Sequence, residues 1–364
     1  MPTPFDPHPF LRSGHAQTIA GWALKRRIVL PAPEDRLFNV AHGVQVLCRI
    51  HWQEEKIHRG EGSRGGNQHG SIQKSKVKSQ NFLTLILIHG LEGSSESKYI
   101  LGTASNAFAA GMNVVRMNIR NCGGTERLSR TLYHSGLSED IAAVASVLGE
   151  DRRVDGIVLA GFSLGGNQVL KLAGEWRDSP PPYVRAVAAV SPAMDLDASC
   201  DLLHAHRNRI YEWHFLRSLK QRVRLKRKLF PESAAHIEPG DAIGEPEVVS
   251  ARKTSIDLSR IRSMREFDDR ITAPAFNFAG AADYYVRASA SPGLTRIAVP
   301  TLAIYALDDP FICVLPETRD RLQSNPNITV LKCEHGGHCG FIAADGKRWA
   351  EEQVVNFFMD RVIR

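Results

Sequence analysis

The sequence predicts an α/β fold, in which a mostly parallel central sheet is flanked by helices and carries a helical cap insertion. Short apolar runs typical of buried strands alternate with helical patterns over 82–192 and again over 299–361. Between these blocks, 195–290 is polar, basic and aromatic, with little strand signal. Such alternation is typical of βαβ units and a parallel sheet. We therefore expect a core formed by 1–194 and 291–364, and a cap or lid formed by 195–290 over the carboxyl edge of the sheet.

The length and composition suit a globular protein of this class. The chain has 364 residues, of which 43% are hydrophobic, and this is enough for a large α/β domain with an insertion. No apolar run approaches the roughly 20 residues that cross a bilayer as a helix. Residues 1–17 contain early prolines and an acidic residue, and they lack the apolar stretch of a signal peptide. We therefore expect a cytoplasmic protein.

The cysteines and the net charge exclude two further classes. The six cysteines lie mostly far apart, at positions 48, 122, 200, 313, 333 and 339. We expect reduced thiols rather than a disulfide framework. The formal net charge of +7 is too small to indicate nucleic-acid binding by itself, and no recognisable nucleic-acid-binding module accompanies it. We therefore expect no nucleic-acid partner.

The region before the first buried strand divides into three parts. Residues 1–40 are rich in proline and are expected to be irregular. The segment 40–52 alternates between apolar and polar residues and is expected to be a strand. The segment 53–81 is polar, glycine-rich and charged, so it cannot bury enough apolar surface to become ordered. We expect 53–81 to be a mobile surface loop.

The remaining elements follow from the alternation of apolar runs and helical patterns. Strands are expected at 82–90, 112–120, 156–162, 184–192, 299–307 and 328–334. Helices are expected at 97–110, 138–150, 164–174, 316–324 and 347–361. Ser138 is expected to cap the helix that follows it, where Glu139 and Asp140 suit the positive end of the helix dipole.

The junction between one of these strands and the next helix carries a single hydroxyl, that of Ser163. Gly161, Ser163 and Gly165 match the pattern G-x-S-x-G of a nucleophile elbow. In such a turn the small residues let the two backbones approach, and the N–H of the next residue, Leu164, faces the forming oxyanion. The alternative is a serine in a glycine-rich turn that packs a helix on a sheet. The strand before Ser163 and the helix after it favour the nucleophile.

Two later strands supply the partners that a serine nucleophile needs. Asp308 and Asp309 follow one predicted strand, and His335 and His338 follow the next. A carboxylate must hold the imidazole in the tautomer that accepts the serine proton. We favour Asp309, because the acid usually follows its strand after a short turn, and His338, because it lies in the flexible stretch GGHCG. Asp308 is then a turn or capping residue, and His335 is structural.

The second oxyanion donor is expected in the loop after the strand at 82–90. His-Gly is followed there by Leu91, whose backbone N–H is the candidate. His89 is expected to be a packed structural histidine rather than a second base.

Five motifs together resemble one branch of the α/β-hydrolases. They are FLRSGHAQT (10–18), HGLEGSSESKY (89–99), GFSLGGN (161–167), DDPF (308–311) and GGHCGF (336–341). In this order, and over almost the whole chain, they are similar to the bacterial YheT-like proteins. That branch is related to the plant EMB8 proteins and to the animal abhydrolase-domain 1 and 3 enzymes.

The resemblance implies an α/β-hydrolase fold with a Ser–Asp–His triad, carried over here as Ser163, Asp309 and His338. It implies hydrolysis of carboxylic esters, with acyl esters or lipids as substrates, and it implies no metal and no organic cofactor. One departure concerns Asn121, which follows Arg120 where related sequences commonly have glycine. This change removes no catalytic group.

A zinc site is an alternative for the last of these motifs. Cys333, His335, His338 and Cys339 form C-x-H-x2-H-C, and all four are of types that bind zinc. The spacing matches no common zinc finger, and the segment runs from a buried strand into a loop. We therefore expect no metal and treat His338 as a free base.

The cap contains a strongly basic stretch, 215–230. Leu216, Leu219, Val223 and Phe230 can share one helical face there, with basic residues elsewhere on the helix. Such a helix suits weak peripheral contact with anionic lipid. The alternative is a lid helix that packs its apolar face on the core and exposes a solvated basic face.

The predicted function is that of a serine hydrolase that cleaves carboxylic esters through an acyl-enzyme intermediate, with a small acyl ester or lipid as its partner. A lipase or phospholipase, a thioesterase and an acyltransferase would use the same scaffold, and a non-catalytic binding protein could retain the turn. Aromatic residues of the cap are expected to shape the acyl pocket or to pack within the lid. They are Tyr211, Trp213, Phe215, Phe267, Phe276, Tyr284 and Tyr285.

Overall fold

The computed structural model describes residues 4–54, 82–231 and 256–362, and it has the α/β architecture that the sequence predicts. Eight strands form one sheet in the order β1-β2-β4-β3-β5-β6-β7-β8. The strands from β4 to β8 in this order pair in parallel, whereas β1 pairs antiparallel with β2, and β2 with β4. The strands are β1 (Glu34–Ala41), β2 (Val44–His51), β3 (Phe82–Ile88), β4 (Asn113–Met117), β5 (Val154–Phe162), β6 (Val184–Val190), β7 (Thr301–Ala306) and β8 (Ile328–Cys333).

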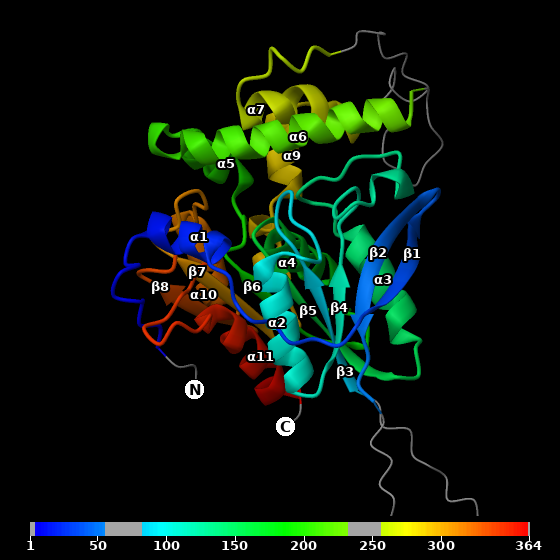
Figure 1. The fold of residues 1–364 in the computed structure, drawn as a ribbon, viewed down its shortest axis with the longest axis vertical. Coiled ribbons are helices and arrows are strands. Elements are labelled where there is room, and N and C mark those ends of the chain that lie inside the picture. Colours follow the sequence, from blue (N-terminus) through cyan, green and yellow to red (C-terminus); the bar gives the residue numbers. More distant parts are fainter. Residues whose placement is uncertain (1–3, 55–81, 232–255, 363–364) are drawn as a thin grey trace, which may run out of the picture.

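Helices cover both faces of the sheet and one of its edges (Figure 1). Those outside the cap are α1 (Gly14–Ala23), α2 (Lys98–Ala109), α3 (Glu139–Gly149), α4 (Leu164–Trp176), α10 (Pro316–Ser324) and α11 (Trp349–Val362). Those between β6 and β7 are α5 (Leu196–His204), α6 (Arg209–Leu229), α7 (Met264–Phe267), α8 (Ala273–Ala275) and α9 (Ala281–Ala288). Every strand and helix that the sequence predicts between β3 and the end of the chain is present, most of them with shifted ends and α10 with the predicted ones.

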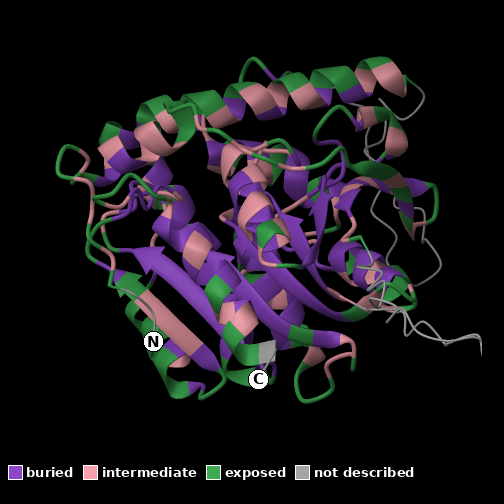
Figure 2. Ribbon diagram, turned by 60° about the horizontal axis from the view of Figure 1, so that its bottom comes forward, coloured by how far each residue is buried: buried purple, intermediate pink, exposed green. Residues whose placement is uncertain are grey.

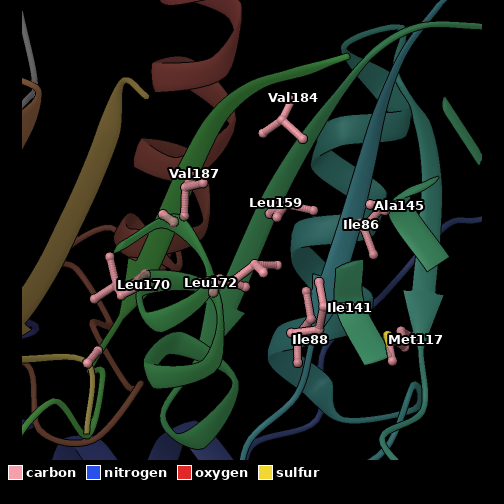
Figure 3. Packing of buried hydrophobic residues seen from close by; sticks show 14 of the residues in the cluster. Ile86, Ile88, Met117, Ile141, Ala145, Leu159, Leu170, Leu172, Val184 and Val187 are labelled. Atoms are coloured by element: carbon pink, nitrogen blue, oxygen red, sulfur yellow. The ribbon is translucent and has the colours of Figure 1, made fainter. Parts of the chain in front are cut away.

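The central strand β3 shows why the sheet needs helices on both faces. Ile86 and Ile88 lie in one core with residues of α3 and α4, among them Ile141 (Figure 3). Leu85 and Leu87 point the other way, into a second core with residues of α2 and α11. Burying each such side chain stabilises the fold by roughly 1.5–3 kcal/mol. The continuous apolar run therefore marks a strand that is buried on both faces.

The parallel strands end along one edge of the sheet. β3 ends at Ile88, β5 at Phe162, β7 at Ala306 and β8 at Cys333. The loops after these four strands, together with the first residue of α4, Leu164, carry all of the site residues that the sequence predicts. The topology therefore gathers residues that are far apart in the chain.

The region before β3 differs from the sequence expectation. Residues 1–40 were expected to be irregular, but they contain α1 and β1. The hydroxyl of Ser13 caps α1 by accepting a hydrogen bond from the N–H of Ala16 at 3.2 Å. The single strand expected at 40–52 is a hairpin of β1 and β2, which turns at Gly43 with φ +65°. Both elements depend on tertiary partners, since β1 is a polar edge strand and α1 is only weakly amphipathic.

Ser138 does not cap α3 as the sequence suggests. Its buried hydroxyl donates to Glu175 of α4 at 2.6 Å, and its backbone (φ −88°, ψ −23°) is already helical rather than extended, as a capping residue would be. Asp140 is also drawn inward, where both of its oxygens accept from Arg120 at 2.6 Å. The loop that holds Arg120 and Asn121 is thereby fixed to α3.

The loop expected at 53–81 lies outside the described residues from position 55 on. Nothing in the fold therefore tests the expectation that it is mobile.

The helices between β6 and β7 form a layer over the carboxyl edge of the sheet (Figure 1). Their core is a third apolar cluster, which includes Leu216, Leu219 and Val223 of α6. It also includes Leu132 and Phe311, which lie outside 195–290. The division of the chain at 194 and 291 therefore stays a prediction, since the cap core shares residues with the sheet domain.

The burial pattern separates the sheet from the outer face of the cap (Figure 2). The strands β3 to β7 are almost wholly buried, whereas α6 alternates buried and exposed residues along its length. Among the helices that the structure describes, none combines the length and apolarity that crossing a membrane requires.

Candidate active site

Ser163 sits in a strained turn between β5 and α4. Its backbone has φ 56° and ψ −118°, in a region that residues other than glycine rarely adopt. A Cβ on Gly161 would lie 2.1 Å from the carbonyl oxygen of Gly165, and a Cβ on Gly165 would lie 2.5 Å from the carbonyl oxygens of Ile88 and His89. Both glycines are therefore required for α4 to approach the sheet, and the turn carries the Ser163 side chain at the sheet edge.

Asp309 and His338 form a buried pair at the same edge. Oδ2 of Asp309 lies 2.8 Å from Nδ1 of His338, and the two side chains are 2% and 12% exposed. Oδ1 of Asp309 accepts the N–H groups of Phe311 and Ile312 at 3.1 and 3.0 Å. Burial alone would lower the pKa of His338, but the Asp309 carboxylate raises it above its ordinary value. The pair therefore has the geometry of a carboxylate that orients an imidazole.

Two contacts connect this pair with Ser163. The ring of Phe311 lies 4.1 Å from the ring of His338, and Phe311 lines the same cavity as Ser163. The carbonyl oxygen of Val190 accepts the N–H of Ser163 at 2.9 Å and lies 3.9 Å from Sγ of Cys339. Ser163 and the loop of His338 therefore share neighbours on both sides.

Asp308 and His335 form a second, looser pair beside the first. His335 Nδ1 lies 3.4 Å from Oδ2 of Asp308, and both side chains contact solvent. The other oxygen of Asp308 accepts the N–H of Gly337 at 2.8 Å. Asp308 thus supports the turn before His338, while Asp309 reaches the imidazole.

The loop after β3 presents an unpaired backbone donor beside Ser163. Leu91, Ser163 and Leu164 line one cavity, and within the described ranges no group accepts the N–H of Leu91 or Leu164. His89 is fully buried, with Nδ1 2.8 Å from the carbonyl oxygen of Gly90 and Nε2 accepting the N–H of Ile119 at 3.1 Å. Burial lowers the pKa of His89 to about 4. Both ring nitrogens of His89 have hydrogen-bond partners in the backbone. His89 therefore stabilises the conformation of the loop, as the sequence suggested.

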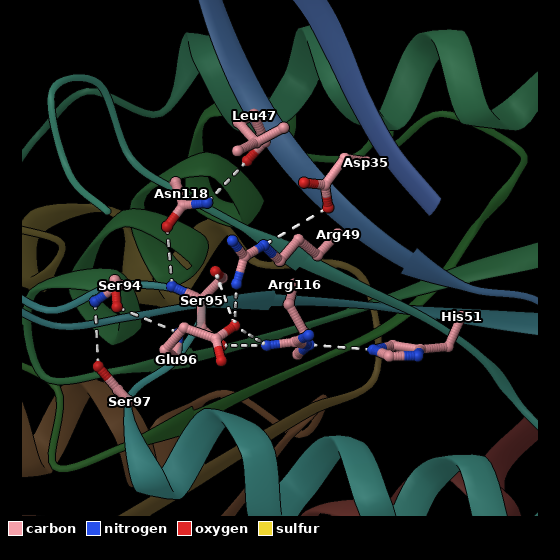
Figure 4. Close-up of polar contacts among 10 residues, drawn as sticks. All are labelled: Asp35, Leu47, Arg49, His51, Ser94, Ser95, Glu96, Ser97, Arg116 and Asn118. Carbon is pink, nitrogen blue, oxygen red and sulfur yellow. Dashed lines mark hydrogen bonds and ion pairs between the residues drawn. The ribbon is translucent and has the colours of Figure 1, made fainter. Parts of the chain in front are cut away.

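The end of this loop is fixed to the sheet by a network of charged groups (Figure 4). Glu96 Oε1 accepts from Nη1 of Arg49 and Nη1 of Arg116, each at 2.5 Å. Arg116 also donates to the carbonyl oxygen of Ser95 at 2.6 Å, and Oδ1 of Asn118 accepts the N–H of Ser95 at 2.9 Å. The loop that carries Leu91 therefore has one rigid end.

The cavity lies between Ser163 and the cap and has a volume of about 120 Å³. Most of its lining is apolar, and it comes from Leu132, Leu196, Leu203, Leu219, Val223, Met264 and Phe311, among others. Four of the aromatic residues expected to shape a pocket line it, namely Phe215, Phe267, Tyr284 and Tyr285. The other three do not line it. Tyr211 packs on Phe311 and Phe276 on His134, whereas Trp213 is 58% exposed.

Comparison with known proteins identifies the family. Residues 84–345 match the family described as the alpha/beta hydrolase fold. The chain belongs to this family.

Relatives of this α/β-hydrolase agree with the resemblance seen in the motifs. The YheT protein of Escherichia coli strain K12, named as a proposed esterase, is 33% identical over 287 residues, which are 77% of this chain and 78% of YheT. The embryogenesis-associated protein EMB8 of Picea glauca is 26% identical over 76% of this chain and 58% of its own length. Human phospholipase ABHD3 is 25% identical over 77% of this chain and 62% of its own length. The match thus spans less than two thirds of these two eukaryotic relatives.

Solved structures agree on the fold. The 2,6-dihydroxy-pseudo-oxynicotine hydrolase superposes with a TM-score of 0.54 at 16% identity, over 96% of this chain and 72% of that hydrolase. At this identity the likeness shows a shared α/β-hydrolase fold and nothing finer.

The four residues of the zinc alternative have different polar or packing partners in this α/β-hydrolase. Cys333 is buried in the core with α2 and α11, His335 faces Asp308 and His338 faces Asp309. Cys339 lies against Val190. In the described part of the chain no three His, Cys, Asp or Glu side chains are grouped as metal ligands. The spacing C-x-H-x2-H-C therefore does not produce a ligand cluster.

Sequence reasoning missed the role of α1 in this α/β-hydrolase. Gln17 is fully buried, and its side-chain amide exchanges two hydrogen bonds with the backbone of Ile342, at 3.0 and 2.7 Å. The hydroxyl of Thr18 accepts the N–H of His338 at 2.8 Å. A Cβ on Gly14 would lie 1.7 Å from the carbonyl oxygen of Asp308. The motif FLRSGHAQT thus holds the loops of Asp309 and His338 in place. Its glycine and its glutamine were the sequence features that could have indicated this role.

Replacing Gln17 with leucine tests the contact between α1 and the backbone of Ile342. The free energy of unfolding should fall by about 1–3 kcal/mol, because the buried N–H of Ile342 loses its acceptor, whereas the C=O of Ile342 keeps the N–H of His8. Urea unfolding followed by circular dichroism measures the change. Gln323→Leu, on the exposed face of α10, is the matched control and should stay within about 0.5 kcal/mol. Equal losses in the two variants would show that Gln17 is no more important than a surface residue.

Proposed function

We propose that this protein is a serine hydrolase that cleaves carboxylic esters through an acyl-enzyme, with Ser163 as nucleophile, His338 as general base and Asp309 as the group that orients the imidazole. The observation that carries the proposal is the buried Asp309–His338 pair, 2.8 Å apart, at the edge where Ser163 occupies its strained turn. Membership of the α/β-hydrolase family supports the same reading, since the triad residues stand in the order Ser, Asp, His.

The hydrogen bonds of Asp309 fix the roles of its two oxygens. Oδ1 is occupied by two backbone N–H groups, so Oδ2 is left for Nδ1 of His338. Nδ1 then carries the proton, and Nε2 has a lone pair with which it can accept the proton of the Ser163 hydroxyl. The second carboxylate, that of Asp308, is turned to Gly337 and His335 and takes no part.

The proposed reaction proceeds in two halves. Ser163 attacks the acyl carbon as His338 accepts its proton, and the N–H groups of Leu91 and Leu164 stabilise the oxyanion. Each preorganised donor of this kind is worth roughly 3–4 kcal/mol in the transition state. The alcohol leaves with the proton from His338, and water activated by the same histidine then releases the acid.

The cavity suits an acyl group. Its lining is mainly aliphatic and aromatic, and it includes Ser163. We propose acyl esters or lipids as the substrate class, which agrees with a relative named as a phospholipase. A thioesterase or an acyltransferase would share the acyl-enzyme and differ only in the leaving group or the acceptor.

Replacing Ser163 with alanine tests the nucleophile. The wild-type protein should hydrolyse some p-nitrophenyl esters in the series from acetyl to palmitoyl, and the variant should lose at least about 10⁴-fold in kcat, because no other group can form the acyl-enzyme. Ser324→Ala, on exposed α10, serves as the control. A fluorophosphonate probe should label the wild-type protein and not Ser163→Ala. Equal hydrolysis by the two proteins would exclude Ser163 as the nucleophile.

The pH dependence of Asp309→Asn tests the acid. The negative charge of Asp309 raises the pKa of His338, and the base works only after it loses its proton. The acidic limb of kcat/KM should therefore lie above the ordinary histidine pKa of about 6.5 in the wild type. It should move to lower pH in Asp309→Asn, while kcat falls by about 10⁴-fold because the tautomer is lost.

Asp308→Asn is the matched control for that variant. It makes the same chemical change one residue away, and kcat should fall by less than about tenfold. If Asp308→Asn caused the larger loss, the assignment of the acid would have to be reversed.

We also propose weak contact between the basic segment 215–230 and anionic lipid, with a different basis from the one that the sequence suggested. Leu216, Leu219 and Val223 are buried in the cap core, so the apolar face cannot enter a membrane without unfolding the cap. The exposed face of α6 carries basic side chains instead, namely Arg217, Arg224 and Lys228. Contact would then be electrostatic and sensitive to salt.

Liposome flotation at low salt tests this contact. More protein should float with vesicles of phosphatidylcholine and phosphatidylglycerol than with phosphatidylcholine alone. Replacing Arg217, Arg224 and Lys228 together with glutamate should remove the difference. Equal recovery of the wild-type protein with both kinds of vesicle would contradict the proposal.

A further inference from the structure

The loop after β3 also forms hydrogen bonds with the cap, through the carboxylate of Glu92. Glu92 follows Leu91 and has φ 55°, in the left-handed region. Its carboxylate accepts four hydrogen bonds, from Nε and Nη2 of Arg222 at 2.8 and 3.1 Å, from the hydroxyl of Ser218 at 2.5 Å and from the hydroxyl of Tyr133 at 2.7 Å. The side chains of Glu92 and Arg222 are only 7% and 11% exposed.

Two of these partners come from the lid helix α6. Ser218 and Arg222 stand one helical turn apart, so they reach Glu92 from the same face of the helix. Arg222 also lines the cavity together with Leu91 and Ser163. The ion pair is therefore next to the proposed chemistry and fastens the cap to the residue that follows the first oxyanion donor.

The position of this carboxylate creates an electrostatic problem. A buried negative charge close to Leu91 would oppose the negative charge that forms on the substrate oxygen. In a poorly hydrated site such a repulsion is only weakly screened. The guanidinium of Arg222 balances the carboxylate, and the hydrogen bonds hold Glu92 in a backbone conformation that it would otherwise rarely adopt.

We propose that Arg222 and Ser218 of the lid helix are positioning residues. By holding Glu92 in place, they keep the backbone N–H of Leu91 directed at the oxyanion. This inference rests on the proposed function. The loop is then fixed at two points, by Arg116 at Glu96 on the sheet side and by Arg222 at Glu92 on the cap side. It follows that α6 stays docked during acylation, and that a lid lifted at α6 leaves the oxyanion hole incomplete.

Steady-state hydrolysis of p-nitrophenyl butyrate by the full chain tests the proposal. Arg222→Gln should lower kcat by about 10–100-fold with KM changed less than about threefold, because a transition-state interaction is weakened. Arg209→Gln makes the same change at an exposed position of α6 and should leave both constants within about twofold. Thermal unfolding of each variant separates loss of folded protein from loss of turnover.

The double variant Glu92→Gln/Arg222→Gln distinguishes charge balance from simple anchoring. It removes the repelling carboxylate together with its partner, and its kcat should recover at least about fivefold over Arg222→Gln. A double variant no faster than Arg222→Gln would overturn the role of charge. If Arg222→Gln does not fold, Ser218→Ala removes one hydrogen bond and should lower kcat by about 3–10-fold at unchanged KM. A kcat within twofold of wild type would then overturn the proposal.

The outcomes separate this inference from the proposed function. Equal kcat in Arg222→Gln, Arg209→Gln and wild type, with Ser163→Ala inactive, would reject the lid contact and keep the serine hydrolase. A wild-type protein that neither hydrolyses esters nor reacts with a fluorophosphonate would reject the proposed function itself, and the lid contact with it.

Discussion

The close approach of α4 to β3 and β5 is the constraint on which the rest of the site depends. It exists because Gly161 and Gly165 lack side chains, whose first carbon atoms would lie 2.1 and 2.5 Å from backbone oxygens. The approach forces Ser163 into its left-handed turn and leaves the N–H of Leu164 at the start of a helix, without a partner in the chain described. One packing contact therefore positions both the proposed nucleophile and one of its oxyanion donors.

The loops around this turn are held by polar contacts in addition to apolar packing. The side chain of Gln17 hydrogen-bonds to the backbone of Ile342. Arg116 donates hydrogen bonds to Ser95 and Glu96, and Arg222 donates to Glu92. A buried polar group that loses its partner costs several kilocalories per mole, so each contact allows few alternative positions. Hydrogen bonds of this kind suit a site in which small displacements change the rate. They also explain why residues outside the reacting groups belong to the motifs.

The neighbouring pairs of Asp309 with His338 and of Asp308 with His335 show how burial assigns roles to identical side chains. The two aspartates are adjacent in the chain, the two histidines are three positions apart, and each aspartate faces a histidine. Asp309 is almost fully enclosed and is held by two backbone N–H groups, so its charge acts strongly on one imidazole. Asp308 is partly solvated, and its influence on His335 is screened.

The alternation of apolar strands and helices determined the fold, and the order of Gly-x-Ser-x-Gly, aspartate and histidine determined the candidate triad. Both are local or ordered patterns, which a chain carries without reference to its packing. Only the tertiary structure decided that β1 and α1 form, since a polar edge strand and a weakly amphipathic helix are stabilised by partners far away in the chain. It also decided that Arg222 of the basic helix contacts Glu92, 130 positions away in the chain, because long-range charge pairing leaves no periodic trace in the sequence.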